Sequence, residues 1–203
     1  MFPLLLFFFN DMNDDRKNDV PRAAAVAIIE IAKPDREVLV LRRSASKHDH
    51  WSAQYAFPGG RCQTDDGSPL STAIRETSEE CGIKLSPAAL VETLPTTPAA
   101  RSTKHPVPVH PFHFLLDHRP SLTLQQREIQ GACWVKIEDF LHPNGHAMRE
   151  MMPGRLPGRY YPSWPLADYY LWGFTYELTL RIFGDDNILN NLPVDPFPSR
   201  SNR

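Results

Sequence analysis

Residues 57–83 read FPGGRCQTDDGSPLSTAIRETSEECGI, and this stretch decides the fold. Ser68-Pro69 predicts the start of a helix, because serine caps a helix N-terminus and proline suits its first position. The helix is expected to run to about Cys81, where Gly82 supplies a left-handed exit. The stretch therefore predicts one helix that is reached from the glycine pair Gly59-Gly60 across a polar loop.

The predicted helix carries two faces of different character. At about 100° per residue, the smaller and apolar side chains share one arc, which is expected to face a sheet: Leu70, Ile74, Thr77 and Cys81. Glu76, Glu79 and Glu80 share a separate arc. That arc is either a solvated acidic face or a set of hard oxygen ligands for divalent cations. The glycine pair favours the ligand interpretation, because glycines at a strand end let the backbone approach a ligand closely.

The chain around this helix predicts an α/β fold with a mixed sheet. The stretches expected to form strands are 22–32, 37–43, 55–57, 107–117 and 132–137. A short helical turn is expected at 138–141 and a second long helix at 168–183. The proline-containing segment 142–165 is expected to be irregular. Because the order lacks a regular βαβ alternation, a mixed sheet is favoured over a doubly wound one.

Composition limits the classes of function. The 203 residues suffice for one well-packed domain, and 41% hydrophobic and 23% charged residues are ordinary for a soluble protein. A net charge of -2 gives no argument for binding a nucleic-acid polymer or an anionic membrane. The three cysteines lack disulfide-like or zinc-like spacing. We therefore expect reduced thiols and a cytoplasmic location. The chain is expected to act as a monomer or homodimer.

The two ends of the chain are expected to lie outside the folded domain. Residues 1–21 are expected to be a disordered N-terminal segment, with Met12 as the native start and residues 1–11 not native. The apolar run at 1–9 is too short to span a bilayer. The domain is expected at 22–184, followed by a tail at 185–203.

Residues 60–83 resemble the signature of the Nudix hydrolase family, G-x5-E-x7-R-E-U-x-E-E-x-G-U, where U is aliphatic. The match is strong at the end that carries Arg75-Glu76 and Glu79-Glu80. Asp66 stands in place of the first glutamate, and the gap from there to Arg75 is one residue longer than in the pattern. Thr77 occupies an aliphatic position. The longer gap also occurs in the branch that resembles coenzyme A pyrophosphatases, to which this chain is most similar.

The resemblance extends beyond the signature, over roughly residues 22–184. Residues 51–61, WSAQYAFPGGR, resemble the W-S-G-Q-x-A-F-P-G-G-R run of bacterial members close to that branch. Glu128-Ile129 before Trp134-Val135 resembles an E-V…W-V segment, and residues 171–175 resemble a late W-G-x-T helix. The resemblance implies an α/β/α sandwich with a mixed sheet.

The resemblance also implies metal-dependent cleavage of a phosphate-anhydride bond. Mg²⁺ or Mn²⁺ would be bound by Glu76, Glu79 and Glu80, with the Gly59 carbonyl as a further ligand. Arg75 would orient Glu79 rather than touch the substrate. The implied substrate is a small nucleoside diphosphate linked to another group.

Several assignments within this scheme stay open. The general base is Glu79, Glu80 or the more distant Glu128. The candidate substrate contacts are Arg43, Gly60 and Arg61.

The substrate is predicted less sharply than the bond that is cleaved. Coenzyme A or a derivative comes first, but residues 47–54, KHDHWSAQ, lack the arginine and Gly-Glu of that branch. ADP-ribose, dinucleoside polyphosphates and oxidised nucleoside triphosphates therefore stay open. A non-catalytic Nudix domain that binds a nucleotide or a protein partner is the alternative. The presence of all three helix glutamates favours the enzyme.

Overall fold

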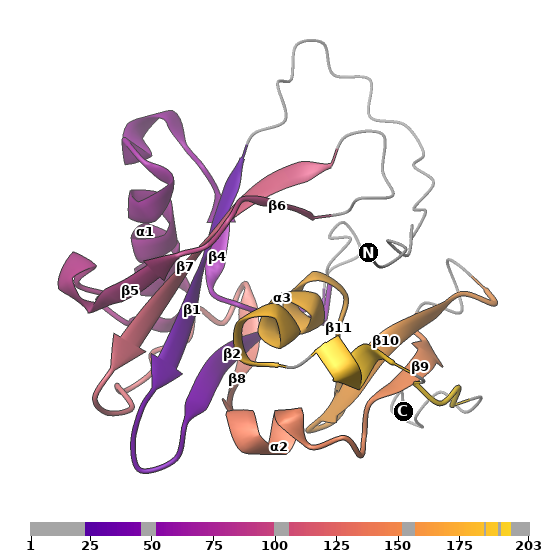
Figure 1. Ribbon diagram of the computed structural model, residues 1–203. Helices are drawn as coiled ribbons and strands as arrows, with labels where there is room; N and C mark the ends of the chain where they lie inside the picture. Colours follow the sequence, from indigo (N-terminus) through magenta and orange to yellow (C-terminus); the bar gives the residue numbers. More distant parts are fainter. Residues whose placement is uncertain are drawn as a thin grey trace, which may run out of the picture. The chain divides into compact units, whose positions relative to one another are not determined.

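The structure, a computed structural model, describes residues 23–45, 52–99, 106–151, 157–184, 186–190 and 192–195. The chain divides into two compact units that alternate along the sequence. The first unit comprises Met1–Lys33 and Phe57–Gln126, and the second comprises Pro34–Ala56 and Arg127–Arg203. Figure 1 shows the strands and helices of each unit. The predictions for residues 1–21 and for the segment 46–51 lie outside the described residues.

The first unit is built on a mixed sheet. Its longest strands, β1 (Ala24–Ile31) and β7 (Val107–Leu116), run parallel over the whole length of β1. Every other pairing in this unit is antiparallel among the described residues: β4 (Gly59–Arg61) pairs with β1, and β5 (Leu90–Thr93) and β6 (Thr97–Ala99) pair with β7. The predicted mixed sheet in an α/β fold is confirmed.

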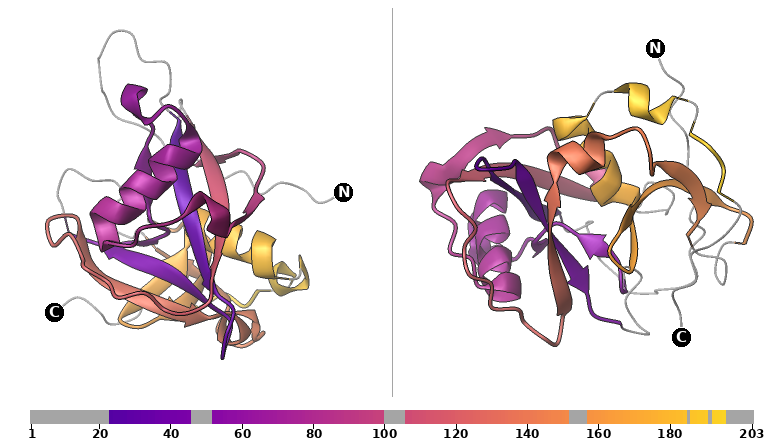
Figure 2. Two further views of the ribbon diagram at one scale, coloured as in Figure 1. Left: turned by 90° about the vertical axis from the view of Figure 1, so that its left-hand side faces the viewer. Right: turned by 90° about the horizontal axis from the view of Figure 1, so that it is seen from below.

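Helix α1 (Pro69–Cys81) packs on this sheet, against β1, β4 and β7 (Figures 1 and 2). Its bounds agree with the prediction at both ends. The Ser68 hydroxyl accepts a hydrogen bond from the Ser71 N–H, and Gly82 ends the helix at a φ of 76°. Two of the last carbonyls of α1 accept backbone hydrogen bonds from Thr123 and Gln125 at 2.9 Å each. The helix is thus fixed at both termini.

The prediction of its buried face was right in part. Thr77 and Cys81 are buried as expected, and the Thr77 hydroxyl donates to the Ala73 carbonyl at 2.7 Å. Leu70 and Ile74 are only half-buried. The remaining fully buried positions are Thr72, Ala73 and Glu80. The buried face is therefore turned toward Ala73 and Glu80, because α1 packs on β4 as well as on β1.

The second unit holds two antiparallel groups of strands. In one, β2 (Glu37–Arg43) pairs with β3 (Tyr55–Ala56) and β8 (Ile129–Lys136). In the other, β10 (Tyr160–Leu166) lies between β9 (Ala147–Glu150) and β11 (Tyr169–Trp172). Helices α2 (Ile137–Leu141) and α3 (Gly173–Phe183) contact each other, and α3 packs on β10 and β11. Three short 3-10 turns complete the described elements: Thr64–Asp66, Pro87–Ala89 and Asp186–Leu189.

The sequence prediction was wrong for the segment 142–165, which contains β9 and most of β10. Side chains of β10 alternate between buried and more exposed, with Tyr161 and Ser163 on the buried face. Pro162 and Pro165 conceal this period of two, because prolines are rare inside paired strands. The second long helix also begins later than predicted, since Tyr169–Trp172 forms β11. Gly59-Gly60 likewise begins a strand, β4, rather than only ending one.

Part of the C-terminal tail is docked on the second unit. Val194 forms a parallel bridge with Met148 of β9. The Arg149 Nε donates to the Asp195 carboxylate at 3.0 Å, and the same guanidinium donates to the Ser163 carbonyl at 3.1 Å. Residues 192–195 therefore extend the β9 edge. In the described part of the chain, no helix is long and apolar enough to cross a bilayer.

Candidate active site

The glycine pair lies on β4, beside the beginning of β1. Gly59 is paired with Val26 and has a φ of 153°, a conformation that side-chain-bearing residues rarely adopt. A Cβ at Gly59 would overlap the Ala25 carbonyl oxygen and the Val26 backbone. The Gly59 N–H donates to the Glu80 carboxylate at 2.9 Å. The backbone thus passes too close to β1 for any side chain, and it is bonded directly to the glutamate helix.

Gly60 makes room for a carboxylate. A Cβ at this position would stand 2.5 Å from Cδ and from Oε1 of Glu76. That distance is far below ordinary van der Waals contact. The second glycine of the pair therefore allows the Glu76 carboxylate to lie against the β4 backbone.

Arg75 connects the acidic groups of the site. Its Nη1 lies 2.9 Å from Oε1 of Glu76 and 3.0 Å from Oε2 of Glu79. Its Nε and Nη2 donate to the two oxygens of Asp66 at 2.6 and 3.0 Å. The sequence predicted that Arg75 orients Glu79, and the hydrogen bond between them at 3.0 Å is consistent with that role. A single guanidinium therefore separates and orients three carboxylates that would otherwise repel one another.

Asp66 has a role that the sequence reading did not foresee. Besides Arg75, its carboxylate accepts the Gln63 N–H at 2.8 Å and the Thr72 hydroxyl at 2.7 Å. The side chain is only 6% exposed. Hydrogen bonds from Arg75, then from Gln63 and Thr72, hold the pKa of Asp66 well below its usual range, and Asp66 raises the pKa of Arg75. Asp66, although it departs from the signature, thus holds Arg75 in place. Its position in the signature, where a glutamate is usual, was the feature of the sequence that could have indicated this role.

The three helix glutamates differ in their exposure. The side chain of Glu79 is 57% exposed and that of Glu76 is 14% exposed. Glu80 is 4% exposed, which corrects the expectation that it shares one arc with Glu76 and Glu79, well away from the buried face. Helix periodicity could not predict the burial of Glu80, because the hydrogen-bond partner of its carboxylate, the Gly59 N–H, lies 21 residues earlier in the chain.

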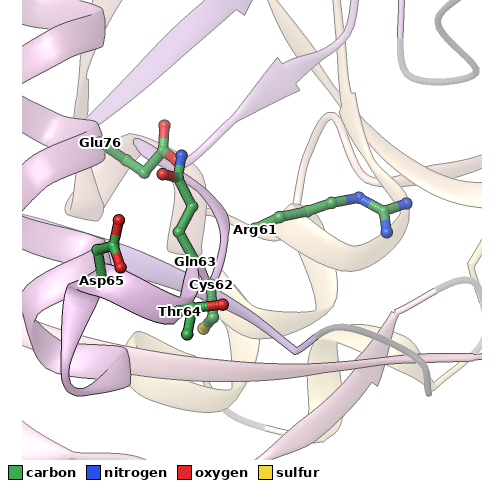
Figure 3. Close-up of a pocket in the computed structure, with 6 residues that line it drawn as sticks. All are labelled: Arg61, Cys62, Gln63, Thr64, Asp65 and Glu76. Atoms are coloured by element: carbon green, nitrogen blue, oxygen red, sulfur yellow. The ribbon is translucent and has the colours of Figure 1, made fainter. Parts of the chain in front are cut away.

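An open cavity of about 650 Å³ adjoins Glu76 in the first unit. Residues 61–65, from the end of β4 and the segment that follows it, provide the rest of its lining. In the close-up of Figure 3, the Gln63 side chain points toward Glu76, whereas the Arg61 side chain extends away from it. Arg61, a predicted substrate contact, therefore borders the cavity next to the glutamate helix.

Two predicted site residues belong to the second unit. Arg43 ends β2 and is paired with Ile129, and Glu128 lies in the exposed turn directly before β8. The Ser44 N–H donates to the Glu128 carbonyl at 2.7 Å. The pairing of β2 with β8 therefore brings Arg43 and Glu128 close to each other.

The fit of a metal ion depends on the carboxylates of the first unit. Within the described ranges, no three histidine, cysteine, aspartate or glutamate side chains form a metal-binding group as they lie. Mg²⁺, however, is usually bound through one or two carboxylates and keeps several waters. The carboxylates of Glu76 and Glu79 both contact Nη1 of Arg75, so they lie close together. Gly60, which has no side chain, leaves room beside Glu76. The donor chemistry present thus fits a hard divalent cation.

The cysteines and histidines of the first unit have other roles. Burial raises the pKa of the Cys81 thiol to about 11, as expected for an unreactive core residue. His113 contacts Glu30 at 2.8 Å in the buried sheet, and His110 contacts the Thr96 hydroxyl at 3.0 Å. His48 and His50 lie outside the described residues.

Comparison with protein families and curated proteins gives a consistent result. The model of the NUDIX domain matches residues 21–154. An uncharacterized protein of Schizosaccharomyces pombe is 31% identical over 168 residues, which cover 71% of this chain and 50% of that protein. This chain thus spans about half the length of that relative. The uncharacterized Nudix hydrolase NudL of Yersinia enterocolitica is 28% identical over 165 residues, covering 81% of this chain and 82% of the relative. NudL of Yersinia pestis is 30% identical over 154 residues, covering 76% and 74%.

Solved structures show the same fold. A MutT/nudix family protein from Enterococcus faecalis superposes with a TM-score of 0.57 at 14% identity, covering 83% of this chain and 63% of that one. The NUDIX domain of Shewanella oneidensis NrtR, solved with ADP ribose, superposes with a TM-score of 0.51 at 19% identity, covering 64% and 81%. The predicted fold class is thereby confirmed.

Proposed function

Because this chain belongs to the NUDIX domain family, we propose that it is a metal-dependent hydrolase that cleaves the phosphate-anhydride bond of a nucleoside diphosphate linked to another group. The observation that carries the proposal is the grip of Arg75 on Glu76 and Glu79 beside Gly60. Such an arrangement keeps two carboxylates close together, and one of them, Glu76, lines the cavity. Two carboxylates this close repel each other, and a bound cation would remove that repulsion.

In this proposal Glu76 and Glu79 hold a divalent cation, Mg²⁺ or Mn²⁺, with Glu80 and the Gly59 carbonyl as further ligands. A cation of this kind neutralises the charge of a diphosphate and makes a water molecule easier to deprotonate. Arg75 keeps its position through Asp66, so the two carboxylates are oriented before substrate arrives. Their orientation therefore costs little during the reaction.

Glu79 is our first candidate for the general base. It is the most exposed of the three helix glutamates, and its hydrogen bond to Arg75 leaves the carboxylate facing solvent. A base must reach a water that attacks phosphorus, which a buried group does less readily. Glu80 and Glu128 stay as alternatives. Glu80 is engaged by the Gly59 N–H, and Glu128 lies in an exposed turn of the second unit.

Glu80 has a second role in this scheme, because it holds the β4 backbone. Its carboxylate accepts the Gly59 N–H, and Gly60 follows directly beside Glu76. A shift of Glu80 would therefore move the glycine pair relative to the other glutamates. Glu80 is thus proposed both to bind the cation and to fix the distance between β4 and α1.

The substrate class is argued from the lining of the cavity. Arg61 and the Gln63 amide can donate hydrogen bonds to phosphate oxygens, and the volume of about 650 Å³ is of the size that small-molecule ligands occupy. Arg43 is a further proposed substrate contact. Coenzyme A or a derivative is our first candidate substrate from the sequence. ADP-ribose is the second, because the NrtR domain with the same fold was solved with that compound.

The test is an assay of the full chain with a panel of diphosphates. Coenzyme A, ADP-ribose, a dinucleoside polyphosphate and an oxidised nucleoside triphosphate are each incubated with Mg²⁺ or Mn²⁺, and products are separated by chromatography. We expect cleavage between two phosphorus atoms of at least one compound, abolished by a chelator and restored by added metal. A folded chain that cleaves none of them contradicts the enzyme proposal.

That second outcome would favour a non-catalytic domain that binds a nucleotide or a protein partner. The two functions are separated by measuring binding of the same compounds by calorimetry. Tight binding without cleavage supports the binding domain, whereas cleavage supports the hydrolase. The arrangement around Arg75 favours the hydrolase, because the binding of a nucleotide alone does not require three oriented carboxylates.

A further inference from the structure

Arg42, on β2 of the second unit, is a buried cation with unused hydrogen-bond donors. The residue is only 9% exposed. Within the described part of the chain, its Nε and Nη1 are buried and make no hydrogen bond. Guanidinium groups carry donors on every nitrogen, and leaving buried donors unmet is unfavourable. A side chain of this kind points to a ligand that would accept those hydrogen bonds.

Two tyrosine rings flank the Arg42 guanidinium. Its central carbon lies 4.9 Å from the ring centroid of Tyr55 and 4.4 Å from that of Tyr169. Contacts of this length are favourable cation–π interactions. The rings hold the plane of the guanidinium in one position, but they do not accept the hydrogen bonds of Nε and Nη1. Arg42 is therefore oriented without being satisfied.

Asp168 is the one acidic partner that the structure gives Arg42 in the described residues. Its carboxylate lies 3.9 Å from Nη2, which is too long for a hydrogen bond, and its side chain is 72% exposed. The other carboxylate oxygen accepts a hydrogen bond from the Tyr55 hydroxyl at 3.3 Å. An exposed ion pair of this length compensates a buried charge only weakly. Asp168 therefore occupies the place of an anion without binding Arg42 closely.

The backbone near Arg42 supports the interpretation of a site rather than of simple packing. Asp168 lies in the two-residue turn between β10 and β11, and the preceding residue of that turn, Ala167, has a φ of 49°. A positive φ is unfavourable for alanine. On the other side, the register between β2 and β8 shifts between Arg42 and Arg43. Such irregularities re-aim side chains and are frequent next to binding sites. The turn that carries Asp168 thus contains a strained residue, and the pairing of β2 is irregular directly after Arg42.

We propose that Arg42 binds an oxoanion group, a phosphate or a carboxylate of a ligand, when the turn at 166–169 moves aside and Asp168 gives up its place. An oxoanion matches the planar set of donors that a guanidinium offers. The ligand group would replace Asp168 at Nη2 and would also accept from Nε or Nη1, because each of these two unmet nitrogens shares an edge of the guanidinium with Nη2. Tyr55 and Tyr169 would continue to hold the guanidinium plane. The proposal uses none of the proposed hydrolytic residues of α1, and its test does not depend on their activity.

The test uses the full chain labelled with ¹⁵N-arginine. The Nε–Hε resonance of Arg42 is assigned by its loss in Arg42→Lys and followed while inorganic phosphate or acetate is added at constant ionic strength. We expect a saturable shift. A response to phosphate alone assigns the site to phosphate groups, and a response to both anions assigns it to oxoanions that include carboxylates.

Asp168→Asn gives the decisive comparison. Because it removes the competing carboxylate from an exposed position, this variant is expected to fold and to lower the half-saturating anion concentration about threefold. Arg36→Lys is the matched control, since Arg36 also lies over an aromatic ring, that of Phe183 at 5.7 Å, and should leave the response unchanged. The proposal is overturned if neither anion gives a saturable shift in the wild type and in Asp168→Asn. Weaker binding by Asp168→Asn would equally overturn it. If Arg42→Lys does not fold, the titration of Asp168→Asn decides alone.

Discussion

Asp66 and Arg75 form a two-point contact, with Nε and Nη2 of the guanidinium donating to the two carboxylate oxygens at 2.6 and 3.0 Å. Asp66 belongs to the 3-10 turn Thr64–Asp66, and Arg75 belongs to α1. Their contact joins the loop that lines the cavity to the helix that carries the glutamates. The remaining donor of Arg75, Nη1, is left for Glu76 and Glu79.

Asp66→Asn should therefore lower hydrolytic activity without altering any proposed metal ligand. The amide of Asn has only one oxygen that can accept, and its NH2 group cannot, so Arg75 loses one of its two anchors and orients Glu79 less well. Losses of about 10- to 100-fold in kcat are typical when a residue that orients a ligand is changed. Steady-state kinetics with the best substrate of the panel measures the effect.

The control for this variant is Asp65→Asn, which removes the same charge from the neighbouring position. It should leave the melting temperature unchanged, whereas Asp66→Asn should lower it. Equal melting temperatures and equal kcat for Asp66→Asn and the wild type would show that the contact with Arg75 has no functional role.

The two glycines of β4 should respond differently to alanine. Gly59→Ala forces a side chain into the backbone of β1 at a φ that alanine tolerates poorly, so it should destabilise the fold by at least about 1–3 kcal/mol. Gly60→Ala meets only the flexible end of Glu76, so stability should change little while activity falls about a hundredfold. Urea unfolding and kinetics on both variants check this. Gly131→Ala, where the nearest atom would be 3.7 Å away, is the control. A reversed pattern, with Gly60→Ala unfolded and Gly59→Ala unaffected, contradicts the described geometry.

Glu79→Gln and Glu80→Gln should separate the proposed base from the residue that holds the backbone. Glu79→Gln removes an exposed carboxylate, so kcat should fall about a hundredfold or more with unchanged stability. Glu80→Gln keeps an oxygen that accepts the Gly59 N–H, so the fold should persist. Turnover should be lost, because the variant lacks one of the proposed carboxylate ligands of the cation. Kinetics and thermal unfolding measure both. Wild-type turnover in Glu79→Gln would move the base to Glu80 or Glu128, and wild-type turnover in Glu80→Gln would remove it from the metal set.

His146 should make the second unit less stable in acid. It contacts the Tyr176 hydroxyl at 2.8 Å and the Phe140 carbonyl at 2.6 Å, and burial holds its pKa below the usual value. The unfolded chain therefore takes up a proton near pH 6.5, which the folded chain resists. Stability is present above that pH and is lost as the pH falls toward the lowered pKa of the folded state.

Urea unfolding at pH 7.5 and pH 5 measures this effect in the wild type and in His146→Gln. The variant should lose about 1–3 kcal/mol at pH 7.5, because it disturbs buried hydrogen bonds, but it should depend less on pH. His118→Gln, which changes an exposed histidine, should behave as the wild type. An equally steep pH dependence in His146→Gln would assign the acid sensitivity to other groups.

Features with local causes were predictable from sequence. The bounds of α1 follow from Ser68, Pro69 and Gly82, which act within one turn of the helix ends. The strand at Glu37–Arg43 and the short helix near 138–141 were likewise predicted from continuous patterns. These signals lie in consecutive residues, so no knowledge of distant contacts was needed.

Features set by distant contacts were not predictable. The burial of Glu80 depends on a backbone N–H that only the pairing of β4 with β1 brings near. β9 and β10 stabilise each other across the chain, and prolines obscure the pattern of β10. The environment of Arg42 is made by residues from β3, from β11 and from the turn before β11. Which glutamate acts as the base stays a prediction.

The Asp66–Arg75 contact also bears on how such sites are recognised in other chains. An acid that is one methylene shorter than glutamate reaches the arginine here from a loop that is one residue longer than in the usual signature. We infer that at this position the shorter side chain and the longer spacing compensate for each other. Search patterns with fixed spacing would reject this chain, although its arginine is anchored at two points. Asp66→Glu without shortening the loop would be expected to push Arg75 out of line, and a one-residue deletion in the same loop would be expected to restore it.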